Sequence, residues 1–97
     1  MSTHIILANY TDQGIRNIKQ SPSRLDLAKD MIRQLGGNVK DFYLTMGAYD
    51  LVMVVDIPSD EIGAQMLLAL GSLGNIRTTT VRAFTETQFR EIVQALP

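Results

Sequence analysis

The sequence contains no cysteine, and its only histidine is His4. Without cysteine the chain cannot form a disulfide, present a thiolate nucleophile or bind a metal through sulfur, and one histidine cannot build a metal site by itself. We therefore expect no metal site. The sequence also lacks a phosphate-binding loop, a serine nucleophile motif and a catalytic pair of carboxylates, so it predicts no bound cofactor.

Charge of either sign is never concentrated in one stretch. Nine basic and ten acidic residues are scattered along the 97 residues and leave a formal net charge of -1. This pattern provides no basic surface for nucleic acid or anionic lipid. The apolar run at residues 51–55 is too short to span a bilayer, and the N-terminus lacks the basic region of a signal peptide. We expect a cytoplasmic protein with no nucleic-acid or membrane partner.

The chain is organised around residues 45–56. Gly47 marks a tight turn, Tyr49 and Asp50 follow it, and residues 51–55 are all apolar. A short continuous apolar run is typical of a strand buried on both faces, because a half-exposed strand would alternate. The composition, 45% apolar in 97 residues, suits one hydrophobic core. We therefore expect residues 1–97 to form a single domain.

Turn and capping signals divide the rest of the chain. Strands are expected at residues 3–10, 38–46, 49–57 and 76–84. Thr11 can cap a brief helix that ends near Ser21, where a longer helix begins and continues to Gly36. Ser59 can cap a second long helix. The capping box at residues 85–88 predicts a C-terminal helix with its apolar side turned inward, namely Phe89, Ile92, Val93 and Leu96.

The second and third strands should form a hairpin. Gly47-Ala48 fits a two-residue connection, because glycine at its first position suits the turn that matches the twist of paired strands. In the second strand, simple alternation places Val39, Asp41 and Tyr43 on one side and Phe42 on the other. Its mixed polarity indicates a strand at the edge of the sheet.

Strand-helix-strand followed by strand-helix-strand is the ferredoxin-like βαββαβ order, an α+β fold. Right-handed connections predict a four-stranded antiparallel sheet of order 4-1-3-2, with both long helices on one face and the C-terminal helix as an addition. The first and third strands then lie at the centre. They are also the most apolar strands in the sequence, which supports this topology.

Two helices cover only one face of such a sheet, yet residues 51–55 offer apolar side chains to both faces. Leaving each of these side chains in water would cost roughly 1.5–3 kcal/mol. We therefore expect a second copy of the chain to cover the free face, as in a dimeric α/β-barrel with two-fold symmetry. Alternatively, the C-terminal helix folds back over the free face of a monomer.

Several separated blocks resemble the GYD-domain family. They are Asn9 to Ile15, Phe42 to Asp50 with its Gly47-x-Tyr49-Asp50 core, and Ala69 to Thr80. The resemblance covers nearly the whole chain and implies a dimeric α/β-barrel assembly of ferredoxin-like protomers. No activity follows from it, since the biochemical activity of that family is not established.

A more distant similarity connects the half from Gly47 to Thr80 with the effector-binding domain of Lrp/AsnC-type regulators. In those regulators amino acids bind between subunits near the loops around this motif. The present chain has no helix-turn-helix segment, so the similarity implies ligand sensing without direct contact to DNA.

These resemblances and the polar residues near the hairpin suggest a binding site for a small carboxylate such as an amino acid. The candidate ligand-binding residues are Tyr10, Tyr43, Tyr49, Asp50, Arg77 and Thr79. Arg77 could bind a carboxylate through two hydrogen bonds. Because Arg77 and Arg82 are five residues apart in one strand, they point to opposite faces. The structural alternative is that Tyr49 packs at an interface, Asp50 caps backbone amides, and the arginine forms an ion pair.

Three functions remain open from the sequence. The first is a homo-oligomeric module that binds a small polar metabolite near Gly47 to Asp50. The second is a cofactor-independent oxygenase, isomerase or decarboxylase that uses Tyr49, His4 or Asp50 as proton carrier. The third is a structural or partner-binding subunit. The sequence assigns no catalytic residue.

Overall fold

The computed structural model describes residues 1–97 and contains four strands, four α-helices and one short 3-10 helix. In chain order they are β1 (Ser2–Tyr10), α1 (Asp12–Arg16), η1 (Ile18–Gln20), α2 (Ser21–Gln34), β2 (Asn38–Leu44), β3 (Leu51–Ile57), α3 (Asp60–Ser72), β4 (Ile76–Ala83) and α4 (Glu86–Gln94). None of the helices has the length and apolar character needed to cross a bilayer.

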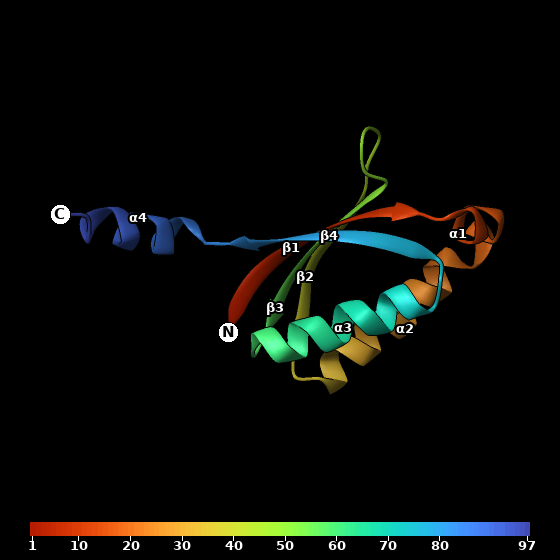
Figure 1. Ribbon diagram of the computed structural model, residues 1–97, viewed down its shortest axis with the longest axis horizontal. Coiled ribbons are helices and arrows are strands. Elements are labelled where there is room, and N and C mark those ends of the chain that lie inside the picture. The colour runs from red at the N-terminus through yellow and green to blue at the C-terminus, as the bar shows by residue number, and fades with distance from the viewer.

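The sheet has the predicted topology. The strands lie in the order β2-β3-β1-β4 and all neighbours are antiparallel. β1 and β3 occupy the centre, and Ile6 pairs with Met53 on one side and Thr80 on the other. Helices α2 and α3 lie together on one side of the sheet (Figure 1). The ferredoxin-like α+β fold expected from the order of the elements is therefore confirmed.

The core lies between the sheet and these two helices. Residues buried there alternate along the central strands, as in Ile6 and Ala8 on β1. α2 contributes Ile32, and α3 contributes Met66 and Leu70. Because side chains alternate along a strand, the odd-numbered residues of β1 lie on the face away from the helices.

Local signals at the helix ends behave as the sequence predicts. The Thr11 side chain accepts a hydrogen bond from the Gly14 amide and caps α1, and Ser59 caps α3 through the Ile62 amide. Thr85 and Gln88 form a complete capping box at the start of α4. Gly36 follows α2 with a φ of 89°, a conformation that favours glycine.

The connection between β2 and β3 is longer than the expected two residues. β2 ends at Leu44 and β3 begins at Leu51, so the predicted strands 38–46 and 49–57 wrongly included residues of the loop. The Thr45 amide donates to the Asp50 carbonyl at 2.8 Å and closes the loop. The Asp50 amide in turn donates to the Ala8 carbonyl of β1 at 2.9 Å. Because Thr45 is bonded to Asp50, residues 46–49 form the loop, which projects beyond the sheet (Figure 1).

A β-bulge corrects the simple alternation expected for β2. The register shifts between Val39 and Asp41, so that Val39 pairs with Val55 and Phe42 pairs with Met53. Val39 and Phe42 therefore both pack against the core, whereas alternation had placed them on opposite faces. The prediction that β2 is an edge strand is confirmed.

Helix α4 does not turn its apolar side inward. Phe89, Ile92, Val93 and Leu96 are between 46% and 64% exposed, and no residue of α4 is buried. Only Phe84 and Thr85 separate β4 from α4. This link does not reverse the chain, so α4 continues past the end of the sheet (Figure 1). The helix covers neither face of the sheet, contrary to the folded-back arrangement considered from the sequence.

The face of the sheet opposite α2 and α3, called the open face below, is apolar at its centre. One row across the strands is Tyr43-Val52-Leu7-Thr79, and the next is Asp41-Val54-Ile5-Val81. No helix of the same chain lies over these rows (Figure 1). Ile5, Leu7, Val52 and Val54 are half-buried in the protomer, and their covering by a second copy remains a prediction.

The start of α1 is clamped to the connection between α3 and β4. The Thr11 amide donates to the Asn75 carbonyl at 3.1 Å, and the Thr11 hydroxyl donates to the Gly74 carbonyl at 2.5 Å. Gln13 Nε2 donates to the Leu73 carbonyl and to Asn75 Oδ1. Gly14 is buried against this connection, and a Cβ there would lie 2.0 Å from the Asn75 carbonyl oxygen. These hydrogen bonds directly join two parts of the sequence that are about 60 residues apart, as in the bond between Gln13 and Leu73.

Replacing Gly14 by alanine should destabilise the fold, because the added methyl group would overlap backbone atoms, which cannot move aside as a flexible side chain can. We expect the free energy of unfolding to fall by about 3 kcal/mol, at the upper end of overpacking effects. Urea unfolding followed by circular dichroism measures this change.

The matched control is Gly71→Ala in α3, where an added Cβ meets nothing within 4 Å. This change should stabilise the protein by roughly 0.5–1 kcal/mol, because alanine is the better helix former. Equal effects of the two substitutions would contradict the close packing of Gly14 against the connection between α3 and β4.

Candidate functional site

Three of the six predicted ligand-binding residues lie on the open face, but not together. Tyr43 on β2 and Thr79 on β4 are at opposite ends of one cross-strand row, separated by Val52 and Leu7. With strands about 4.8 Å apart, their backbones are roughly 14 Å from each other. Arg77 is next to Thr79 on the same face of β4 and pairs with Asn9. Within one protomer this face offers a broad surface rather than a closed site.

The register also separates the two arginines of β4, as predicted. Arg77 lies on the open face, and Arg82 pairs with His4 on the helix side. Arg82 donates to the Thr3 carbonyl at 3.2 Å, and its guanidinium lies 4.4 Å from the centre of the Phe84 ring. Neither arginine forms an ion pair within the protomer.

Asp50 and Tyr10 are brought together by the backbone. Asp50 Oδ2 accepts a hydrogen bond from the Tyr10 amide at 3.0 Å. Asp50 thus continues the pairing of β3 with β1 and caps an amide near the end of β1. Tyr49 lies one residue earlier, in the projecting loop, where its carbonyl accepts a hydrogen bond from the Thr45 hydroxyl at 2.6 Å. Both residues fix the shape of the loop, and their roles in ligand binding remain predictions.

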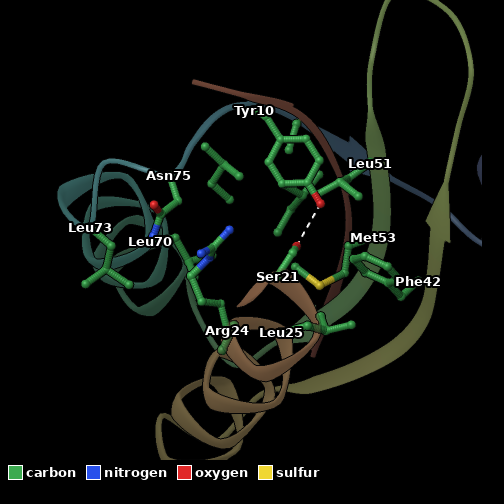
Figure 2. Close-up of a pocket in the computed structure, with 14 residues that line it drawn as sticks. Tyr10, Ser21, Arg24, Leu25, Phe42, Leu51, Met53, Leu70, Leu73 and Asn75 are labelled. Atoms are coloured by element: carbon green, nitrogen blue, oxygen red, sulfur yellow. Dashed lines mark hydrogen bonds between the residues drawn. The ribbon is translucent and has the colours of Figure 1, made fainter. Parts of the chain in front are cut away.

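Among the predicted residues, Tyr10 lines a cavity on the helix side of the sheet. A pocket of about 80 Å³ lies between the sheet, α2 and the end of α3. Its wall is mostly apolar, and the polar groups are Tyr10, Ser21, Arg24 and Asn75. The Tyr10 and Ser21 hydroxyls are 2.7 Å apart and share a hydrogen bond (Figure 2). We refer to this cavity as the Tyr10 pocket.

Arg24 supplies the charge of the Tyr10 pocket. Its guanidinium points into the ring of lining side chains (Figure 2). It donates to the carbonyl of Asn17 at 3.1 Å and to that of Gly14 at 3.4 Å, and it forms no ion pair. A guanidinium has five N–H donors, so Arg24 retains donors for a ligand. The pocket can therefore accept a small anionic head group with a short apolar body.

Sequence reasoning missed Arg24, Ser21 and Asn75 as pocket residues. Arg24 is one turn of helix from Ser21 and precedes the first core residue of α2, Leu25. A charged residue next to the apolar stripe of a helix was the available signal. This signal alone does not predict the role of Arg24, because that role depends on α1 folding across the end of the sheet.

The described residues contain no cluster of three or more histidine, aspartate or glutamate side chains that could hold a metal ion. The Tyr10 pocket likewise has no acid and base in contact, since its only mutual polar contact joins two hydroxyls.

Comparison with known proteins identifies a family and relatives of this chain. The GYD domain family matches residues 4–93. A Thermus thermophilus protein named glutamine synthetase and cystathionine beta-lyase binding protein is 32% identical over 84 residues, covering 86% of this chain and 88% of the relative. The crystal structure of the Thermus thermophilus protein TTHA0845 is similar, with 27% identity and a TM-score of 0.50, covering 88% of this chain and 95% of that one.

Proposed function

This chain belongs to the GYD domain family, and we propose that it is a homo-oligomeric module that binds metabolic enzymes. The observation that carries the proposal is the exposed apolar surface on α4 and at Tyr43 and Val81 of the open face. The name of the Thermus relative supports enzymes as partners, with glutamine synthetase and cystathionine beta-lyase as the first to test.

Self-association uses the open face in this proposal. Val52, Val54, Ile5 and Leu7 form a half-buried apolar centre that a second copy can cover by the same surface. Burying each side chain is worth roughly 1.5–3 kcal/mol, which favours pairing once several are covered together. The loop around Tyr49 projects on this side of the sheet (Figure 1) and would reach past the edge of the partner.

Enzyme binding uses α4. Its apolar residues Phe89, Ile92 and Val93, together with Leu96 just beyond its end, follow the i, i+3, i+4, i+7 spacing of a helix that docks into a groove. The helix extends away from the sheet and is attached by two residues, Phe84 and Thr85. It can therefore enter a partner's groove without disturbing the core.

Replacing Val54 by lysine should convert the oligomer into a monomer, because an ammonium group would have to be buried between two sheets. Light scattering after size exclusion measures the mass, and circular dichroism confirms that the fold is retained. The matched control Leu68→Lys alters a side chain of α3 that is 75% exposed and should leave the mass unchanged. A wild-type protein that is monomeric at high concentration would refute the self-association.

Replacing Phe89 and Ile92 together by alanine should abolish enzyme binding while leaving the oligomer intact. Each truncated anchor removes about 2 kcal/mol if it acts as a hot spot, so binding should weaken more than a hundredfold. Calorimetric titration with purified glutamine synthetase and cystathionine beta-lyase measures the affinity.

The control for this pair is Thr87→Ala with Glu91→Ala, which truncates the polar side of α4 and preserves its helix propensity. If the Phe89/Ile92 variant loses its oligomer instead, the helix serves self-association. If neither enzyme binds the wild-type chain, the enzyme-binding role is wrong.

The Tyr10 pocket favours a second function, the binding of a small carboxylate. Arg24 is the observation that favours it, because a guanidinium with free donors lies at an apolar cavity that also offers two hydroxyls. Among the residues proposed from the sequence, Tyr10 belongs to this site. Tyr43, Arg77 and Thr79 would form a separate ligand surface between protomers, with Tyr49 and Asp50 at its margin.

Replacing Arg24 by glutamine should remove the stabilisation that a short branched carboxylate such as isovalerate provides. A ligand at a hundred times its dissociation constant raises the free energy of unfolding by about 2.7 kcal/mol. Loss of a charge-assisted hydrogen bond should weaken binding by about tenfold or more. Thermal denaturation with isovalerate and with its neutral amide measures both the effect and its dependence on charge.

The comparison variant is Arg77→Gln, which removes the other candidate arginine from the open face. Binding lost in Arg77→Gln and kept in Arg24→Gln would move the carboxylate site to the surface between protomers. No stabilisation of the wild-type chain by isovalerate would exclude the Tyr10 pocket as its site.

A further inference from the structure

The two edge strands of the sheet, β2 and β4, differ in how they are protected. β2 carries the bulge between Val39 and Asp41 and the charged side chains of Lys40 and Asp41. Bulges and charges are devices that keep an edge strand from pairing with another chain. β4 pairs with β1 without a register shift from Ile76 to Ala83, and it contains no proline. Because α4 continues beyond the end of β4 and does not fold back along it (Figure 1), the outer edge of β4 is regular and open.

The hydrogen bonds at the start of β4 show which of its residues point outward. The Thr11 amide donates to the Asn75 carbonyl at 3.1 Å, so these two residues form a bonded pair between β1 and β4. Bonded pairs alternate along an antiparallel ladder, so the odd-numbered residues of β4 direct their amides and carbonyls toward β1. The even-numbered residues direct theirs away from the sheet, where no strand of the same chain lies. They are Ile76, Thr78, Thr80 and Arg82.

These four residues can pair with the same four residues of a second copy. In an antiparallel, two-fold pairing centred on Thr79, Thr78 lies opposite Thr80 of the partner subunit. Ile76 then lies opposite Arg82 of the partner subunit. Each such pair exchanges two backbone hydrogen bonds. One register therefore satisfies every outward amide and carbonyl of the strand.

The side chains are compatible with this register. Arg77 lies opposite Val81 of the partner subunit, and Arg82 lies opposite Ile76, so neither arginine is placed opposite a like charge. The centre of the contact is formed by threonines, which pair favourably across strands. β4 is thus complementary to itself, and this identifies a second copy of the chain as the partner for its edge.

From this self-complementarity we propose that β4 pairs edge to edge with β4 of a second copy and joins two sheets into one. The proposal rests on the open-face association proposed above. A two-stranded contact alone is marginal in water, so single protomers do not form it. An open-face pair presents two β4 edges that bind two others at once, which raises their effective concentration. Two different two-fold contacts then close an assembly of four protomers.

Amide hydrogen exchange followed by nuclear magnetic resonance tests the pairing in the wild-type chain. A free edge protects only alternate amides of β4, because the amides between them are bonded to water. Edge pairing should remove this alternation, so that the amides of Thr78 and Thr80 exchange as slowly as that of Thr79.

The measured mass separates the possible failures. Fast exchange of Thr78 and Thr80 in a protein with the mass of two protomers would overturn edge pairing and leave the open-face association standing. The mass of a single protomer at high concentration would overturn the open-face association and edge pairing with it. Protection that appears only after glutamine synthetase or cystathionine beta-lyase is added would assign the edge to the enzyme, and would also overturn the proposal.

Thr78→Pro should block edge pairing without breaking the bonds between β4 and β1. The amide that is lost points outward, and edge strands tolerate proline at such positions. Light scattering should show the mass falling by half, from four protomers to two. The matched control Thr78→Val keeps the amide and the strand propensity and should keep the wild-type mass. An unchanged mass in a folded Thr78→Pro protein would contradict the pairing.

A disulfide tests the register, because the chain has no cysteine of its own. In the proposed register Thr79 lies opposite Thr79 of the partner subunit as a non-bonded pair, with about 4.5 Å between Cα atoms. A disulfide can span this distance. Thr79→Cys should therefore form a covalent dimer on mild oxidation. The control Arg77→Cys should not, because its two copies would be roughly 14 Å apart along the strands.

Combining Thr79→Cys with Thr78→Pro shows where the cysteines meet. The disulfide should be lost in the combined variant, since the edge contact is blocked. A disulfide that persists there would show that the cysteines meet across the open face, and its absence from Thr79→Cys alone would show that the two β4 strands do not pair about Thr79. Either result would overturn the proposed contact.

Discussion

The apolar side chains on both faces of β3 impose the main constraint on this protein. Leu51, Met53 and Val55 are buried against the helices, and Val52 and Val54 face the other way. Two helices packed on one side cannot cover both sets. β3 is therefore placed at the centre of the sheet beside β1, and the surface that remains uncovered becomes available for other molecules.

A set of hydrogen bonds at one end of the sheet fixes what surrounds this centre. Thr11 and Gln13 hold the connection that leads into β4, and the Asp50 carboxylate holds the Tyr10 amide. These contacts join the three blocks on which the family resemblance rests. They position α1, which in turn holds Arg24 through the carbonyls of Gly14 and Asn17. The blocks therefore define a framework around the Tyr10 pocket.

Features set by neighbouring residues could be predicted from the sequence, and features set by distant contacts could not. The Thr11, Ser59 and Thr85 caps and the strand order follow from local patterns and from the handedness of connections. The length of the β2–β3 loop depends instead on the bond between Thr45 and Asp50 that closes it. The direction of α4 depends on the course of the link at Phe84 and Thr85, and the role of Arg24 depends on α1. None of these three conditions leaves a periodic signal in the chain.

Tyr10 connects the two sides of the sheet. Its backbone amide is bonded to Asp50, at the base of the loop that projects beyond the open face, and its hydroxyl is bonded to Ser21 inside the Tyr10 pocket. A ligand that takes the place of Ser21 as the partner of this hydroxyl would act on the same residue that anchors the loop. Under the proposed function the loop lies beside the neighbouring protomer. If the ligand bound the assembled protein more tightly than the free protomer, it would also strengthen assembly by the same factor. This follows because coupling between two binding equilibria is reciprocal.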